Sequence, residues 1–147
     1  TAMTDPLRLD FEVACAVEHA FDVWTGRLDT WWPRDHTVSG RPAEIVLQGV
    51  IGGRIYERTD EGDEHEWGVI TRWDPPRALG YQWHIGRDRA DATDVEIRFT
   101  AVTSGRTRVE IEHRGWERLA NAEDLRDRNR DGWSAVLRKF ENAATTR

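Results

Sequence analysis

Cysteine is almost absent from this sequence, which has one, Cys15, in 147 residues. A single thiol excludes an internal disulfide and a zinc site built from several cysteines. Cys15 lies in an apolar alternation, so we interpret it as a small core residue rather than a nucleophile. A run of about 18 apolar residues is also absent, as is a charged-then-apolar leader. We therefore expect a cytoplasmic protein that does not contact membranes.

Lysine and methionine are equally scarce, because the sequence has only Lys139 and Met3. Thr1 and Ala2 precede that methionine, and we interpret them as a cloning remnant with Met3 as the native start. Apart from histidine, the remaining basic residues are all arginine, which suggests a bacterial genome rich in GC. The formal net charge is −6, and acidic and basic residues are interspersed. A nucleic-acid partner would need a basic face, so we expect none.

Tryptophan is abundant, with eight residues in the chain. Each indole buries a large apolar area and carries one N–H group that requires an acceptor. A chain of this length can form a core without metal ions or disulfides, and no linker or change of composition divides it. We expect a single domain over residues 1–147, whose tryptophans either form the core or line a cavity.

Hydrophobic periodicity predicts one strand, two short helices, about six further strands and a long C-terminal helix. The period is two over 7–17, helical over 18–34, two again through 43–115, and helical over 119–147. An apolar stripe follows one face of the last helix, formed by Trp133, Val136, Leu137, Phe140 and Ala144. Strands followed by a helix indicate the α+β class, in which a curved antiparallel sheet of about seven strands surrounds the C-terminal helix.

The alternation also predicts which side chains face that helix. In the hairpin over 93–115 the inner positions are Val95, Ile97, Phe99, Val109, Ile111 and His113. Over 78–85, Tyr81 and Trp83 are expected to face inward, whereas Gln82 and His84 are expected to face solvent.

A Pro-Pro pair separates two of the predicted strands. Pro75 and Pro76 cannot donate ladder hydrogen bonds, so they mark a corner between neighbouring antiparallel strands. The facing of the preceding strand, 65–73, stays open. Alternate positions there are apolar, yet Ile70 between them is apolar too, and a bulge beside the corner would reverse the face.

Several stretches carry a family pattern. They are "AVEHAFDVWTG", "GGRIYE", "GVITRWDPPRALGYQW" and the pair "TRVEIEHRGW" and "DGWSAVLRKFE". Together these stretches cover nearly the whole chain and follow one another in the order typical of a known family. The chain resembles homologues of the activator of the heat-shock-protein-ninety ATPase. That family is a branch of the START-like, helix-grip (SRPBCC) superfamily. The resemblance implies a seven-stranded sheet round a long helix, with a cavity between them that the superfamily uses for apolar or amphipathic small molecules.

The implied cavity would be lined by aromatic side chains with polar tips and by their apolar neighbours. The same residues would equally serve as ordinary core. The candidate ligand-binding residues are Trp31, Trp32, Tyr56, Val69, Tyr81, Trp83, Phe99, His113, Trp116, Trp133 and Leu137. By the resemblance, Trp31, Trp32 and Trp116 lie in segments that cap the open end.

His113 is the most informative titratable residue, because it occupies an inward position where the alternation favours an apolar side chain. Either it is a neutral histidine hydrogen-bonded in the core, or it contacts a ligand as a donor or general base. A base needs an orienting group, and Glu57 or Arg58 would face inward depending on a register that the sequence does not fix. Tyr56 would contribute a hydroxyl instead. The cluster at 34–36 is either part of the pocket rim or, as we favour, a solvated loop, and no metal or cofactor is expected.

These observations favour a binding protein over an enzyme. The first hypothesis is that the cavity holds an apolar or aromatic small molecule, oriented by His113 and tryptophan N–H groups. The alternative is an enzyme resembling polyketide cyclases and dehydratases, with His113 and Tyr81 as its acid–base groups. A third hypothesis is a protein-interaction module resembling the chaperone-ATPase activators. A homodimer is compatible with each of them.

Overall fold

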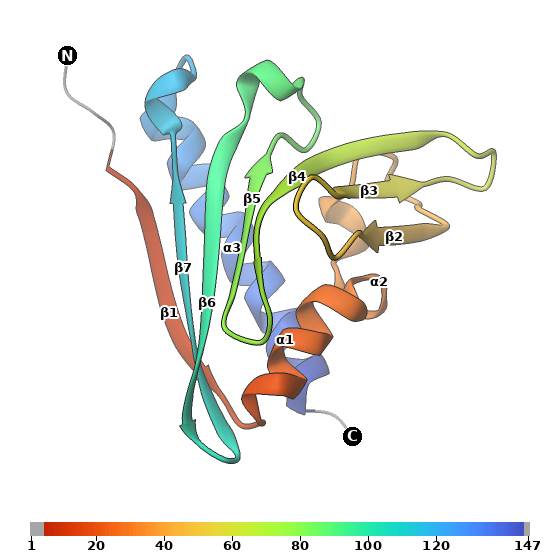
Figure 1. The fold of residues 1–147 in the computed structure, drawn as a ribbon. Helices are drawn as coiled ribbons and strands as arrows, with labels where there is room; N and C mark the ends of the chain where they lie inside the picture. The colour runs from red at the N-terminus through yellow and green to blue at the C-terminus, as the bar shows by residue number, and fades with distance from the viewer. Residues whose placement is uncertain (1–4, 146–147) are drawn as a thin grey trace.

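One curved antiparallel sheet organises the protein, and its computed structural model describes residues 5–145. Seven strands lie in the order β1-β7-β6-β5-β4-β3-β2 (Figure 1). They are β1 (Leu7–Val13), β2 (Glu44–Leu47), β3 (Arg54–Arg58), β4 (Glu64–Asp74), β5 (Ala78–Trp83), β6 (Thr93–Thr103) and β7 (Arg106–Arg114). The predicted α+β architecture is therefore confirmed. The suggested cloning remnant, Thr1 and Ala2, lies outside the described residues.

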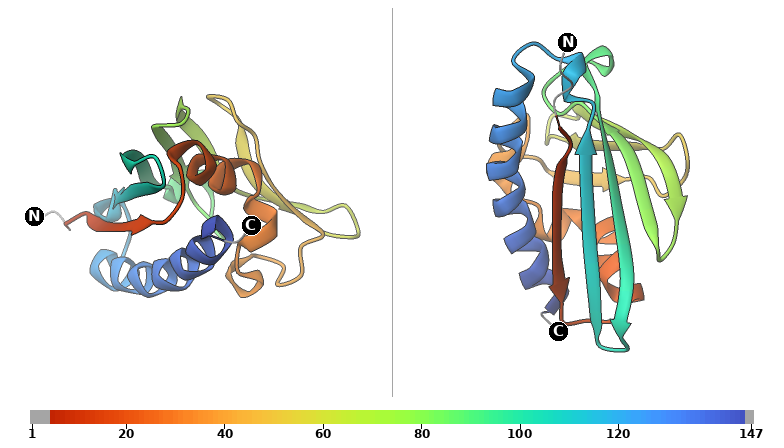
Figure 2. Two further views of the ribbon diagram at one scale, coloured as in Figure 1. Left: turned by 90° about the horizontal axis from the view of Figure 1, so that it is seen from below. Right: turned by 90° about the vertical axis from the view of Figure 1, so that its left-hand side faces the viewer.

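The helices gather on one face of the sheet. The long helix α3 (Ala122–Thr145) runs along that face, while α1 (Val17–Gly26) and α2 (Leu28–Trp31) follow β1 (Figure 2). Three short 3-10 helices complete the fold, namely η1 (Arg34–His36), η2 (Arg89–Asp91) and η3 (Trp116–Arg118). Across residues 5–145, no helix is both long enough and apolar enough to cross a membrane.

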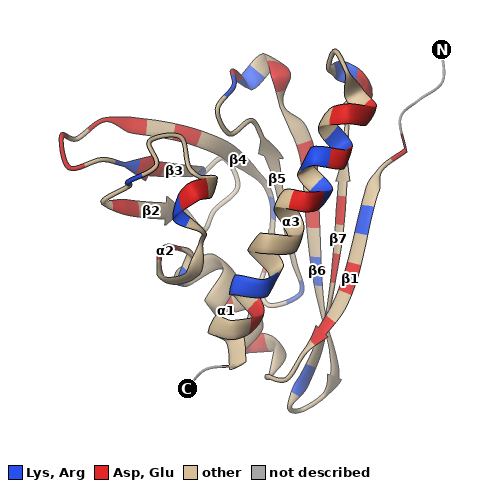
Figure 3. Cartoon of the chain, turned by 180° about the vertical axis from the view of Figure 1, so that it is seen from behind, with Lys and Arg blue, Asp and Glu red and all other residues tan. Residues whose placement is uncertain are grey.

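The hairpin β6–β7 has the two faces that its alternation predicted. Its inner positions are buried, namely Val95, Ile97, Phe99, Val109, Ile111 and His113. Outer positions carry ion pairs, such as the one between Arg108 Nη2 and Asp10 Oδ2 at 2.9 Å. Charged residues also occupy the N-terminal half of α3 (Figure 3). Apolar and polar residues alternate along these strands because only the inner face is buried.

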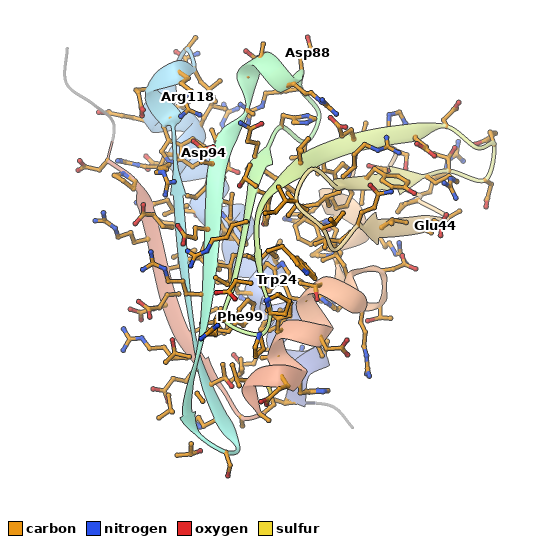
Figure 4. All side chains as sticks on the ribbon, in the orientation of Figure 1. Trp24, Glu44, Asp88, Asp94, Phe99 and Arg118 are labelled. Atoms are coloured by element: carbon orange, nitrogen blue, oxygen red, sulfur yellow. The ribbon has the colours of Figure 1, made fainter. Side chains whose placement is uncertain are left out.

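The core between sheet and helices is largely aromatic. Trp24 of α1 is 1% exposed and packs against Phe99 of β6 and Phe140 of α3, with ring centroids 6.4 and 4.9 Å away (Figure 4). The stripe on α3 is buried at Trp133, Val136, Phe140 and Ala144, whereas Leu137 is only partly buried. The apolar stripe therefore fixes α3 against α1 and the sheet.

Two irregularities settle the facing of β4, which the sequence left open. The pairing of β3 with β4 shifts between Ile55 and Tyr56, and the pairing of β4 with β5 shifts between Ile70 and Arg72. Ile70 lies opposite the buried Tyr81 and faces the helices, while Val69 lies opposite the exposed Gln82 on the other face. The proposed ligand residue Val69 therefore points away from the interior, because the bulge changes the side on which each residue projects.

The corner after β4 is as predicted, but His84, the residue after β5, does not face solvent as expected. β4 ends at Asp74 and β5 begins at Ala78, and Arg77 N donates to Asp74 O at 2.8 Å across the Pro75–Pro76 corner. His84 was expected on the solvent face but is 3% exposed. The strand ends at Trp83, so the alternation no longer applies, and His84 Nε2 lies 3.0 Å from Glu66 Oε2.

Candidate functional site

An aromatic cavity of about 290 Å³ opens between α3, the segment 32–38 and the end of β5. Helix α3 contributes one wall, and the loop that holds η1 contributes the opposite rim. The lining residues are Trp32, His36, Thr37, Val38, Trp83, Ile85, Gly86, Asn129, Gly132, Trp133 and Val136. Three indole rings and mostly apolar neighbours make it the described hollow best suited to an aromatic guest.

Two consecutive tryptophans at the start of this rim have different roles, since Trp31 packs in the core and Trp32 lines the cavity. Trp31 Nε1 donates to Val23 O at 2.8 Å, and its ring packs in the core against Trp24 at 5.2 Å. The chain leaves the helical conformation at Trp32, so its ring projects to the cavity instead. Trp32 Nε1 donates to His36 O at 3.0 Å, which ties the short helix η1 to the cavity wall.

Glu57 is the inward acid whose facing the sequence could not decide. Its side chain is 0% exposed, and its carboxylate accepts hydrogen bonds from Val38 N (2.5 Å), Ser39 N (3.1 Å) and Ser39 Oγ (2.6 Å). A fourth bond comes from Trp67 Nε1 at 2.8 Å. Burial alone would raise the pKa of this carboxyl, but the donors from Ser39, Val38 and Trp67 hold it below its ordinary value. Glu57 therefore fastens the cavity rim at 38–39 to the sheet.

Arg58 and Tyr56, the other residues considered at this register, lie on the outer face. The guanidinium groups of Arg54 and Arg58 lie 4.4 and 5.6 Å from the centre of the Tyr56 ring. Tyr56 is therefore covered by cations outside the sheet and does not reach the cavity, because its strand partner is Glu66 rather than an inner residue.

His113 belongs to the core and not to the cavity lining. Trp133 Nε1 donates to its Nδ1 at 3.1 Å, so Nε2 carries the proton and donates to Thr93 Oγ1 at 2.6 Å. The ring is 0% exposed, and burial lowers the pKa of His113 to about 3, with a smaller contribution from Arg87. His113 is the neutral, hydrogen-bonded histidine of the first alternative, and it positions the Trp133 wall.

This buried neutral histidine should make the protein sensitive to acid. Because the folded pKa is depressed, the stabilisation is present above pH 6.5 and is lost as the pH falls toward the folded value. We expect the free energy of unfolding to fall by about 2 kcal/mol from this residue alone between pH 7 and pH 5. Urea denaturation of the wild type and of His113→Gln at both pH values measures it. Equal losses in the two proteins would contradict the assignment.

His36 is the titratable residue that the structure brings to the cavity, although the sequence favoured a solvated loop over a rim cluster for 34–36. It lies on η1 with its side chain 30% exposed, and its Nδ1 is 2.9 Å from Asp35 Oδ1. Across the cavity, a Cβ placed on Gly132 would be 3.9 Å from His36 Cδ2 and Nε2. Gly132, an unfavourable residue inside a helix, was the available signal that something approaches α3 here.

The predicted ligand residues separate into three groups. Trp32, Trp83 and Trp133 meet at the cavity, whereas Tyr56 and Val69 face outward. The remainder are core or helix residues outside the lining, namely Trp31, Tyr81, Phe99, His113, Trp116 and Leu137. The expected role of tryptophan N–H groups changes as well, because those of Trp32 and Trp133 already donate within the protein.

A curved sheet that grips a long C-terminal helix, with an aromatic cavity between them, defines a helix-grip domain of the kind that binds small molecules. The family model described as activator of Hsp90 ATPase homolog 1-like protein matches residues 14–145. The chain therefore belongs to this family, within the START-like (SRPBCC) proteins. A search of curated proteins gave no match.

Solved structures with the same fold include a synthase and a resistance protein. The anthrahydroquino-Gama-pyrone synthase Txn09 is 30% identical, with a TM-score of 0.64 over 96% of this chain and 97% of that one. CalC from Micromonospora echinospora, a self-sacrificing resistance protein, is 25% identical, with a TM-score of 0.74 over 95% and 93%. The Aha1 dimer from Colwellia psychrerythraea is 17% identical, with a TM-score of 0.71 over 96% of each chain, and supports the fold alone.

Proposed function

We propose that this protein binds a planar aromatic small molecule in the cavity between α3 and the end of β5. The observation that carries the proposal is the meeting of three indole rings, from Trp32, Trp83 and Trp133, around a mostly apolar hollow. Indole faces offer large, rigid contact areas to a flat guest. The volume of about 290 Å³ lies at the lower end for small-molecule sites and suits a compact fused-ring compound.

The relatives give independent support for a fused aromatic guest. An anthrahydroquino-Gama-pyrone, named as the product of the 30% identical synthase, is itself a fused aromatic ring system. That likeness extends over almost the full length of both chains, so the two proteins share the elements that build the cavity. Binding of this chemical class by the present chain remains our proposal.

Emodin, a trihydroxyanthraquinone, is a suitable probe for the binding test. We expect emodin to quench the tryptophan emission saturably, because the ring would lie against the cavity indoles. The variant Gly132→Leu should weaken binding about tenfold or more, since its side chain would enter the cavity beside His36. Fluorescence titration at pH 7, corrected for light absorption with N-acetyltryptophanamide, measures both affinities.

A matched variant controls for the added leucine. Ser134→Leu places the same side chain on the exposed face of α3 and should leave the affinity within about twofold. Circular dichroism checks that both variants are folded. Absence of saturable quenching in the folded wild type, or equal affinity in all three proteins, would refute a ligand site at this cavity.

A homodimer is a separate proposal about assembly. The Colwellia relative is described as a dimer, and β1 forms one edge of the sheet in this chain. At the other edge, β2, Ile45 N already donates to Asp29 Oδ1 at 3.1 Å, so β1 is the better candidate for pairing. Light scattering during size-exclusion chromatography would show a dimer as twice the mass of the 17.0 kDa chain. A single peak at the monomer mass would exclude it at the concentration used.

A further inference from the structure

The polar atoms of the cavity indicate what kind of aromatic compound it would take. Trp32 Nε1 donates to His36 O, Trp133 Nε1 donates to His113 Nδ1, and Thr37 Oγ1 donates to Arg34 O. These lining groups therefore have no free hydrogen to offer a ligand. Of the lining indoles described within 5–145, only Trp83 has an N–H group without a partner.

Acceptors, by contrast, are available on α3, at Asn129, and on the opposite rim, at His36. Asn129 Nδ2 donates to Leu125 O at 2.8 Å, and no described residue donates to its Oδ1. His36 Nδ1 is 2.9 Å from the Asp35 carboxylate, which can only accept, so the geometry assigns the ring proton to Nδ1. The lone pair of Nε2 is then free and lies on the edge of the ring that faces Gly132. A guest that carries hydroxyl groups matches this lining.

Asp35 accepts from His36 as a carboxylate. The hydrogen bond that His36 donates is the main cause that lowers the pKa of Asp35 below its ordinary value, and Lys139 on α3 contributes less. Asp35 is thus ionised at neutral pH and holds the imidazole. The arginine of η1, Arg34, pairs with Asp29 instead of Asp35, with 3.4 Å between Nη1 and Oδ1.

We infer that His36 is the proton acceptor for a hydroxyl group of a phenolic ligand, and that Asp35 is its positioning residue. The inference rests on the proposed function, since it requires an aromatic guest in this cavity. In the step, the phenol O–H bond breaks and the proton moves to His36 Nε2. The electron pair stays on the ligand oxygen as a phenolate, and the imidazolium donates its Nδ1–H to Asp35.

This pairing gives the cavity a chemical role beyond holding a ring. A phenolate is the electron-rich, nucleophilic form of a phenol, and the adjacent imidazolium stabilises it in apolar surroundings. If the protein is an enzyme, the acid–base group is therefore His36 rather than His113, whose two ring nitrogens are both engaged. The enzymatic alternative would then depend on His36 instead of His113.

The visible spectrum of emodin tests the step directly, because its absorption moves to longer wavelength when a hydroxyl ionises. In the complex with wild-type protein we expect the apparent pKa of the emodin hydroxyl to fall by about one unit or more relative to free emodin. His36→Gln should abolish that shift, and Asp35→Asn should reduce it. His19→Gln, on α1 and outside the cavity lining, should keep the wild-type shift.

Binding and proton transfer are read separately in this experiment. Tryptophan quenching at each pH reports whether emodin is bound, and circular dichroism reports whether the variant is folded. Saturable quenching with no spectral shift, or with the same shift in folded His36→Gln, would overturn the role of His36 while leaving the binding site intact. Absence of quenching would instead overturn the proposed function itself.

Discussion

Replacing Glu57 with leucine is expected to lower the free energy of unfolding by roughly 3–5 kcal/mol at pH 7. The leucine would remove the shared acceptor of the N–H groups of Val38 and Ser39, the Ser39 hydroxyl and the Trp67 indole. Each donor that stays buried without a partner adds its own desolvation cost. Urea denaturation followed by circular dichroism measures the loss.

The same substitution should also weaken emodin binding, because Val38 and its neighbours form the cavity rim. Glu44→Leu on the adjacent strand β2 is the matched control, since Glu44 pairs with Arg58 and is 43% exposed (Figure 4). An exposed ion pair contributes at most about 1 kcal/mol, so this control should remain close to the wild type. Equal stability losses in the two variants would show that the buried carboxylate has no special role.

The second large effect is expected at Trp24, where replacement by alanine should cost about 3–5 kcal/mol of unfolding free energy. The indole lies between three elements, with Trp31 of α2 at 5.2 Å, Phe140 of α3 at 4.9 Å and Phe99 of β6 at 6.4 Å. Its removal would leave a void that these rings cannot fill by small shifts. Thermal and urea denaturation measure the cost.

A tryptophan at the edge of the same core provides the comparison for Trp24. Trp73 is partly buried and has one ring contact, with Phe21 at 5.3 Å, so Trp73→Ala should be clearly less destabilising. Trp24 also packs at 6.1 Å against Trp133, a cavity wall. Trp24→Ala should therefore weaken emodin binding even where the protein is folded. A cost no larger than that of Trp73→Ala would contradict this account of the core.

Local rules were sufficient for most of the fold. The strict alternation of β6 and β7 predicted their inner face because one face of that hairpin is wet. The Pro75–Pro76 pair predicted the corner after β4, since neither residue can donate to a ladder. The stripe that includes Trp133 and Phe140 predicted how α3 faces the sheet.

Local rules failed where the pairing of strands changes register. Val69 was a candidate ligand residue although the facing of its strand was left open, and a bulge after Ile70 makes Ile70 the inner residue. The outward position of Tyr56 and the inward position of Glu57 depend on the shift between β3 and β4, which is set by the partner strand and not by the segment itself. One-residue errors of this kind exchange the two faces of a strand.

The candidate site was predicted only in part for a different reason. Trp83 and Trp133 were identified from periodicity, which favours aromatic side chains at the inner surface, whereas Trp32 was identified because the family resemblance places its segment at the open end. His36 lies in an irregular segment, where no period exists to indicate direction, and only the folded chain shows that its ring approaches Gly132 of α3. His113 drew attention as a polar residue at an inner position, yet its partners Thr93 and Trp133 were beyond any local pattern.

Two of the cavity tryptophans, Trp32 and Trp83, pack against the buried Trp67, and these contacts have an optical consequence. The ring centroids of Trp32, Trp67 and Trp83 lie 5.2, 5.8 and 5.9 Å apart, close enough for excitation to pass between indoles before light is emitted. These rings therefore emit as a coupled group, and a guest that touches one of them darkens the others. The depth of quenching then reports whether the cavity is occupied, while the midpoint of the titration, not its amplitude, reports the affinity.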